Sequence, residues 1–429
     1  MSHTGFNIMK LFSKYCLFVF SIILTATSVT AEYSDTTTLP SDQEINSEIH
    51  GADDAKYNVL WLHSERGVNK NLRSSINNIT SKQSVRIILP DFHDSYFIPK
   101  SRSSLSNIPQ QDIEDYITEL AEEIAPKKLY VFTMSRSAGN ILKAAQNLQA
   151  KKKSPITAII MLAPYLQIGT PDIGQKAIYQ EVASQSNLPI YLFQAERSPR
   201  YIPFPDLVKT LETGGSPLFV HILKNVHGGF QMRDKSQLEE QDIAALKQFP
   251  EQVFNALSLL ENTSPAPFVK KNEKTETKVV KKKKVNGLLK VNLETPPIVL
   301  KDLEGKEHNL NDYKGKTVIV SFWASWCRPC LEEMPSLVKL KEDNKESLEI
   351  LAVNIREDKD VIKHFTKGMN INFPVIRDMT SEVVKNWKVY VYPSNFVVDK
   401  MGKVRYAATG AMDWQDDEIN TILKDLMSN

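Results

Sequence analysis

Residues 321–330 read Ser-Phe-Trp-Ala-Ser-Trp-Cys-Arg-Pro-Cys, an apolar run that ends in two cysteines with two residues between them. The run is typical of a buried strand, and a helical stretch follows it. A thiol at the amino-terminal end of a helix faces unpaired backbone N–H groups and the positive end of the helix dipole, which both favour the thiolate. The stretch therefore predicts a reactive cysteine pair at a strand-to-helix junction.

The order of the two cysteines predicts their roles. Cys327 opens the helix beside Arg328, so we expect it to be the exposed, attacking sulfur. Cys330 lies one helical turn further on, and we expect it to be more buried and to attack the mixed disulfide, which releases the product. The alternative interpretation is a pair of unrelated core cysteines.

The count of cysteines supports a redox pair. The chain has 429 residues and three cysteines, and the first of them, Cys16, lies in an apolar leader. A structural disulfide framework needs more pairs, and a zinc site needs further Cys or His nearby. The eight histidines do not cluster at metal-ligand spacing. We therefore expect no metal and no bound cofactor, only a redox-active disulfide between Cys327 and Cys330.

Motifs on both sides of the cysteine pair resemble the thioredoxin-like proteins of the TlpA/ResA type. The resemblance begins at Thr295-Pro296-Pro297 and runs to the end of the chain. Its other motifs are Asp302-Leu303-Glu304-Gly305-Lys306, Leu310-Asn311-Asp312-Tyr313-Lys314-Gly315-Lys316, Trp326-Cys327-Arg328-Pro329-Cys330 and Pro335. It implies a thioredoxin fold over residues 291–429 and a thiol–disulfide oxidoreductase that reduces protein disulfides.

The resemblance also implies roles for residues outside the pair. Glu333 corresponds to the buried acid of the family, which moves a proton and whose pKa burial raises. Pro393 corresponds to the cis-proline of the loop that faces the substrate, with Trp326 and Tyr392 as substrate-binding neighbours. Without the resemblance, Glu333 is an ordinary residue of the first helical turns and Pro393 an edge-strand proline.

Further upstream, strand-like runs alternate with helical ones, which predicts a doubly wound, mainly parallel α/β sheet over residues 55–261. The expected helices cover residues 111–124 and 138–148. The expected strands are 58–62, 85–89, 129–133, 158–162, 190–193 and 218–223.

One turn in this region has the pattern of a nucleophile elbow. Ser135-Arg136-Ser137-Ala138-Gly139 follows a strand and opens a helix, with Ser137 as the expected nucleophile. Glu196 and His227 come later, each just beyond a strand. The order Ser, acid, His resembles that of α/β-hydrolases.

That resemblance implies acyl transfer. His227 would take the proton of Ser137, and Glu196 would orient the imidazole. The oxyanion would be held by the Ala138 N–H and by the loop at residues 63–65. The alternative is a fold that binds a partner without turnover, because this loop lacks the glycine-rich stretch typical of esterases.

The first 31 residues have the pattern of an export signal. Lys10 and Lys14 precede an uncharged stretch, Tyr15 to Ala31, that ends in Val29-Thr30-Ala31. We expect cleavage there and a periplasmic protein; the alternative is an uncleaved anchor in the inner membrane. Residues 32–54 form a polar lead before the first domain.

Residues 262–290 have the composition of a linker. They contain nine lysines, including the run 281–284, and few large apolar residues. The run could also attract an anionic membrane surface.

The formal net charge of +2 and the lack of nucleic-acid motifs argue against nucleic-acid binding. We expect protein disulfide and thiol clients as partners and a membrane electron donor that re-reduces the cysteine pair. Three functions stay open: a reductase whose amino-terminal domain binds clients, a bifunctional protein with an active serine esterase, and a redox domain that acts as an oxidant.

Overall fold

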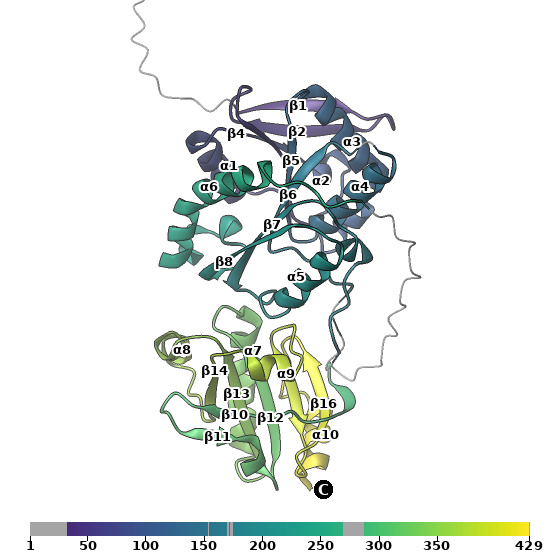
Figure 1. Cartoon of the computed structure of the whole chain (residues 1–429). Coiled ribbons are helices and arrows are strands. Elements are labelled where there is room, and N and C mark those ends of the chain that lie inside the picture. The colour runs from purple at the N-terminus through teal and green to yellow at the C-terminus, as the bar shows by residue number, and fades with distance from the viewer. Residues whose placement is uncertain (1–31, 153, 170, 172–174, 269–286, 429) are drawn as a thin grey trace, which may run out of the picture.

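The computed structural model describes residues 32–152, 154–169, 171, 175–268 and 287–428. They form two α/β domains, an amino-terminal one with a mixed eight-stranded sheet and a carboxyl-terminal one with a six-stranded sheet (Figure 1). The predicted signal, residues 1–31, and the lysine run of the linker lie outside the described residues. In the part of the chain that is described, no helix is both long and apolar enough to cross a bilayer.

The amino-terminal sheet confirms the expected mainly parallel arrangement. Its first two strands are antiparallel to their neighbours, and the six that follow in space run parallel. In spatial order the strands are β1 (Glu32–Thr38), β2 (Glu44–His50), β4 (Val85–Pro90), β3 (Tyr57–Leu62), β5 (Leu129–Met134), β6 (Ile156–Leu162), β7 (Ile190–Arg197) and β8 (Leu218–His227).

Helices cover both faces of this sheet, so its central strands are apolar on both sides, as parallel strands usually are. On one face α3 (Gln110–Glu123), α4 (Ser137–Ala150) and α5 (Phe204–Thr213) pack on side chains such as Leu60. On the other, α1 (Lys70–Lys82) and α6 (Glu240–Glu261) pack on side chains such as Trp61. Residues 60 and 61 point to opposite faces because side chains alternate along a strand.

The expected polar lead over residues 32–54 contributes two strands, so the folded domain begins earlier than predicted. In β2, Ile45, Ser47 and Ile49 are buried while the residues between them are more exposed. This alternation is the period of a half-buried strand. Because the residues on the exposed side are polar, the composition of the segment does not reveal the strands.

The carboxyl-terminal sheet agrees with the thioredoxin fold that the resemblance implies for this region. Its order is β14 (Val375–Asp378), β13 (Leu348–Ile355), β12 (Thr317–Trp323), β15 (Ser394–Val398), β16 (Val404–Thr409) and β9 (Leu289–Leu293). The first three are parallel and the last three antiparallel. A hairpin of β10 (Val299–Lys301) and β11 (Glu307–Asn309) lies beside it.

Four helices complete this domain: α7 (Arg328–Asp343), α8 (Lys359–Thr366), α9 (Glu382–Asn386) and α10 (Asp417–Ser428). The central strand β12 is buried along its whole length and leads directly to the cysteine pair at the start of α7. In Figure 1 the end of the domain that carries this junction faces the amino-terminal domain.

Candidate redox site

The cysteine pair lies at the junction that its sequence predicts. Cys327 caps the amino-terminal end of α7, and Cys330 lies in the first turn. The two form a disulfide with a Cα–Cα distance of 5.3 Å. Cys327 is 6% exposed and Cys330 is 1% exposed. Cys327 is thus the more accessible sulfur, but the protein itself covers most of it.

Glu333 is buried behind the pair, one further turn along α7, with 2% of its surface exposed. Its Oε1 accepts a hydrogen bond from Asn395 Nδ2 at 2.8 Å and another from Trp414 Nε1. Burial raises the pKa of Glu333 to about 8, although the two hydrogen bonds oppose the shift. The group can therefore take up and release a proton near neutral pH.

The loop before β15 packs against the cysteine loop. The Tyr392–Pro393 peptide bond is cis, as the resemblance implies. The Tyr392 ring lies edge-on to the Trp326 ring, with centroids 5.6 Å apart. Tyr392 is 8% exposed, so only a small part of this expected substrate contact is open.

A second buried acid, Glu357, holds the loop that leads into the cysteines. It accepts hydrogen bonds from the Ser325 N–H at 2.7 Å, the Ser325 hydroxyl at 2.5 Å and Asn354 Nδ2 at 2.8 Å. Glu357 was not among the predicted site residues, because it has no local signature in the sequence. A carboxyl group just after an apolar strand was the one available signal.

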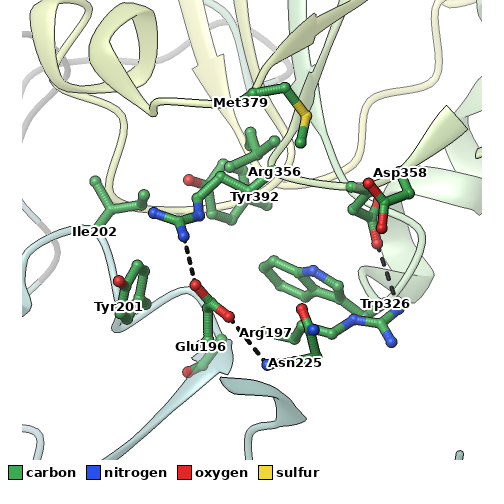
Figure 2. A pocket seen from close by; sticks show the side chains of 13 residues that line it. Glu196, Arg197, Tyr201, Ile202, Asn225, Trp326, Arg356, Asp358, Met379 and Tyr392 are labelled. Carbon is green, nitrogen blue, oxygen red and sulfur yellow. Dashed lines mark hydrogen bonds and ion pairs between the residues drawn. The ribbon is translucent and has the colours of Figure 1, made fainter. Parts of the chain in front are cut away.

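The amino-terminal domain covers this site and binds it with two ion pairs. Arg197 lies 3.4 Å from Glu357, and Glu196 pairs with Arg356 (Figure 2). Residues of both domains line a pocket of about 170 Å³ at this boundary, including Trp326. The contact between the domains thus lies beside Trp326, the residue that precedes Cys327.

The predicted hydrolase triad does not form. Ser137 is fully buried, and its hydroxyl lies 2.7 Å from Met134 O, the carbonyl to which it donates. His227 Nδ1 lies 2.8 Å from Asp242 Oδ2, so Asp242, and not Glu196, is its acid partner. Glu196 is instead the interdomain partner of Arg356. The prediction is wrong because burial and pairing depend on tertiary contacts that strand order does not reveal.

The sharp turn after β5 lies two residues earlier than predicted, at Ser135, which has a positive φ of 56°. Its hydroxyl accepts a hydrogen bond from Arg200 Nη2 at 2.9 Å. The next N–H, of Arg136, points to a Glu65 carboxylate oxygen at 3.5 Å. Glu65 thus brings negative charge to the place where an oxyanion donor is needed, and the predicted donor at Ala138 lies inside α4.

A larger cavity of about 430 Å³ extends from this turn to the redox domain. Four arginines and one acid line its amino-terminal part, and residues 390–392 close it on the other side. The arginines are Arg66, Arg102, Arg136 and Arg200, and the acid is Glu65. The cavity therefore offers a mainly basic surface next to the loop that carries Tyr392.

Thiol–disulfide exchange is the chemistry that the cysteine pair and its buried acid support, and the surrounding sheet is that of the thioredoxin-like oxidoreductases. Residues 291–407 match the AhpC/TSA family. Through this domain the chain belongs to the family of ResA thiol-disulfide oxidoreductases.

Two ResA proteins illustrate the relationship. The ResA of Geobacillus thermodenitrificans is 42% identical over 122 residues, which are 28% of this chain and 70% of that protein. The ResA of Bacillus subtilis is 38% identical over 120 residues, 28% of this chain and 67% of that protein. The exposed lipoprotein thioredoxin Etrx1 of Streptococcus pneumoniae is 31% identical, with a TM-score of 0.28, over 30% of this chain and all of the other.

Proposed function

We propose that the chain is an exported reductant of protein disulfides whose amino-terminal domain selects the clients that reach Cys327. The observation that carries the proposal is Glu333, a buried acid with a pKa near 8 on the helix that begins with the cysteine pair. An exchange reaction needs a group there that accepts and returns a proton.

The reaction begins with the reduced pair. The Cys327 thiolate attacks one sulfur of the client disulfide, which forms a mixed disulfide and releases the other client sulfur as a thiolate. Cys330 passes its proton to the ionised Glu333 and attacks the Cys327 sulfur. The mixed disulfide breaks, the second client thiolate leaves, and protons from Glu333 and water neutralise the products. Two electrons have moved from the pair to the client.

The relatives support the reductive direction of this proposal, and the leader supports the proposed location. The family resemblance favours reduction, and the pattern of residues 1–31 favours export to the periplasm. In an oxidising compartment the pair must be recharged, so a membrane protein that donates two electrons is the expected partner.

The proposed client selection depends on the contact of the amino-terminal domain with the redox domain beside Trp326. Since Cys327 is 6% exposed, a client must displace the contact between Glu196 and Arg356 or enter through the cavities beside Tyr392. The arginines of the larger cavity favour a client segment that carries carboxylates near its disulfide.

A trapping experiment tests the proposal. The Cys330→Ser variant of the full chain lacks the resolving sulfur, so Cys327 should remain joined to a disulfide-bonded protein client after attack. Non-reducing electrophoresis should show the adduct, and the variant without either cysteine should show none. If reduced wild-type chain leaves protein disulfides intact and the trap forms no adduct, the proposal is wrong.

A further inference from the structure

A cluster of two histidines and an aspartate lies in the amino-terminal domain, apart from the redox site. His63 directly follows β3, Asp91 directly follows β4, and His93 lies in the short helix α2 (Phe92–Ser95) that comes next. β3 and β4 are adjacent parallel strands, so their carboxyl ends meet at one edge of the sheet. One ligand atom of each residue lies within 4.8 Å of the others. The histidines are far apart in sequence, so the spacing rule could not find the cluster.

Hydrogen bonds fix which nitrogen of His63 carries hydrogen. Its Nδ1 lies 2.9 Å from the Ser64 carbonyl oxygen, which can only accept. Nδ1 is therefore the protonated nitrogen of the neutral ring. Nε2 is left with a lone pair, 3.7 Å from Asp91 Oδ1.

The same argument applies to His93. Its Nε2 lies 2.7 Å from the Ser104 hydroxyl, and that hydroxyl donates to the Ser101 carbonyl at 2.8 Å. Ser104 must then accept hydrogen from Nε2, which leaves a lone pair on Nδ1 of His93. Carbonyl and hydroxyl groups orient metal-binding histidines in this way.

The two free nitrogens have no hydrogen-bond partner among the described residues. His63 Nε2 and His93 Nδ1 are buried without a hydrogen bond, in residues that are 0% and 3% exposed. Two lone pairs beside a carboxylate repel one another, and such buried groups need a water or an ion.

Protonation of these two nitrogens is disfavoured at neutral pH. Burial and the neighbouring His63 lower the pKa of His93 to about 4, and burial also lowers the pKa of His63. Lys100 also lowers the pKa of both histidines, whereas Asp91 raises it.

We propose that His63, His93 and Asp91 form a binding site for a divalent first-row transition ion, with Zn²⁺ as its representative. Two imidazole nitrogens and one carboxylate are a common zinc ligand set, with a fourth position left for water. Mg²⁺ and Ca²⁺ prefer oxygen ligands and are disfavoured. Zinc–nitrogen bonds are about 2.0–2.1 Å long, so the side chains must close on the ion by about 1 Å.

Zinc titration of the oxidised, metal-free chain tests the site. The Cys327–Cys330 disulfide must stay closed during the titration, because free thiolates would themselves bind zinc. Calorimetry and elemental analysis should give one ion per chain. His63→Ala and His93→Ala should each weaken binding by at least about tenfold, and Ser104→Ala, which frees the His93 ring, by about tenfold.

His364→Ala is the matched control, because His364 is exposed on α8 and should leave binding unchanged. Zinc should also raise the melting temperature of the wild type but not that of the histidine variants. If a histidine-to-alanine variant does not fold, His93→Gln and Ser104→Ala provide the same comparison. The proposal is overturned if the wild type binds no zinc, or if folded histidine variants bind it as tightly.

Discussion

At the scale of single residues, burial changes the acid–base behaviour of Glu333. Its carboxyl group is enclosed by Asn395 and Trp414, from two other parts of the domain, and its pKa rises to about 8. The environment favours the protonated form in the folded state, whereas the unfolded chain ionises near 4.5. This difference couples the protonation of Glu333 to the stability of the domain.

The coupling makes a prediction for Glu333→Gln. Between pH 4.5 and pH 8 the folded wild type holds a proton that the unfolded chain has lost, so its free energy of unfolding falls as pH rises. The glutamine variant lacks this effect. Between pH 4.5 and pH 8 its free energy of unfolding should therefore rise, relative to that of the wild type, by on the order of a few kcal/mol. Urea unfolding of the oxidised protein at several pH values measures the difference.

Glu332→Gln is the matched control, because the Glu332 side chain is 59% exposed and pairs only with Arg328 on the surface. This variant should follow the wild type at each pH. Parallel pH profiles for the wild type and Glu333→Gln would show that Glu333 is not protonated inside the folded domain.

At the scale of elements, the turn between β5 and α4 decides whether the amino-terminal domain is a hydrolase. Ser135 is hydrogen-bonded to Arg200, Ser137 is buried against backbone carbonyls, and the base His227 is paired with Asp242. His227 Nε2 lies 3.7 Å from Glu239, and among the described residues no hydrogen bond joins it to either serine, so neither serine has the histidine that would activate it.

A fluorophosphonate probe should accordingly leave the folded wild-type chain unlabelled, because the probe reacts with activated serines. A known serine esterase, treated in parallel, shows that the probe is active. Labelling that disappears in Ser135→Ala or Ser137→Ala would establish an active serine and contradict this account.

The same elements show what the sequence could predict. Each of the six parallel strands of the amino-terminal sheet contains an apolar run, so each was predicted, although β7 and β8 extend four residues beyond their predicted ends. Cys327 and Cys330 were found for a similar reason, because they lie within one strand–helix unit whose local pattern is strong, whereas the role of Glu333 was predicted only from the family resemblance.

Other parts of the site depend on contacts across the fold. Glu357 accepts a hydrogen bond from Ser325, which follows a different strand. Asp242, in α6, is hydrogen-bonded to His227, at the end of β8. Glu196 resembled a catalytic acid because it follows the predicted strand 190–193, yet it lies within β7 and its partner, Arg356, belongs to the other domain. Pairings of this kind have no spacing rule, so only the structure identifies them.

At the scale of the whole molecule, the amino-terminal domain packs against the redox domain beside Trp326 and Tyr392. The contact includes the pairs Glu196–Arg356 and Arg197–Glu357, and Ile202 of the amino-terminal domain joins the core of the redox domain. A partly exposed ion pair typically contributes about 0.5–1 kcal/mol. The contact can therefore be weakened without unfolding either domain.

Removing one ion pair should expose the redox cysteine more often. In the reduced chain, Arg356→Ala should raise the rate of alkylation of Cys327 about two- to fivefold, which corresponds to the loss of about 0.5–1 kcal/mol. Mass spectrometry of iodoacetamide adducts against time measures the rate. Arg405→Ala is the control, since Arg405 pairs with Asp399 inside the redox domain. Equal rates in all three proteins would mean that the contact does not limit access.

The reduction potential of the Cys327–Cys330 pair tests most directly the claim that the protein is a reductant. The mature chain is equilibrated in glutathione or dithiothreitol buffers, and the fraction of free thiol is measured. We predict a value near that of thioredoxin, ~−270 mV, or lower. A value near that of DsbA, ~−120 mV, would contradict the account and make the protein a disulfide donor.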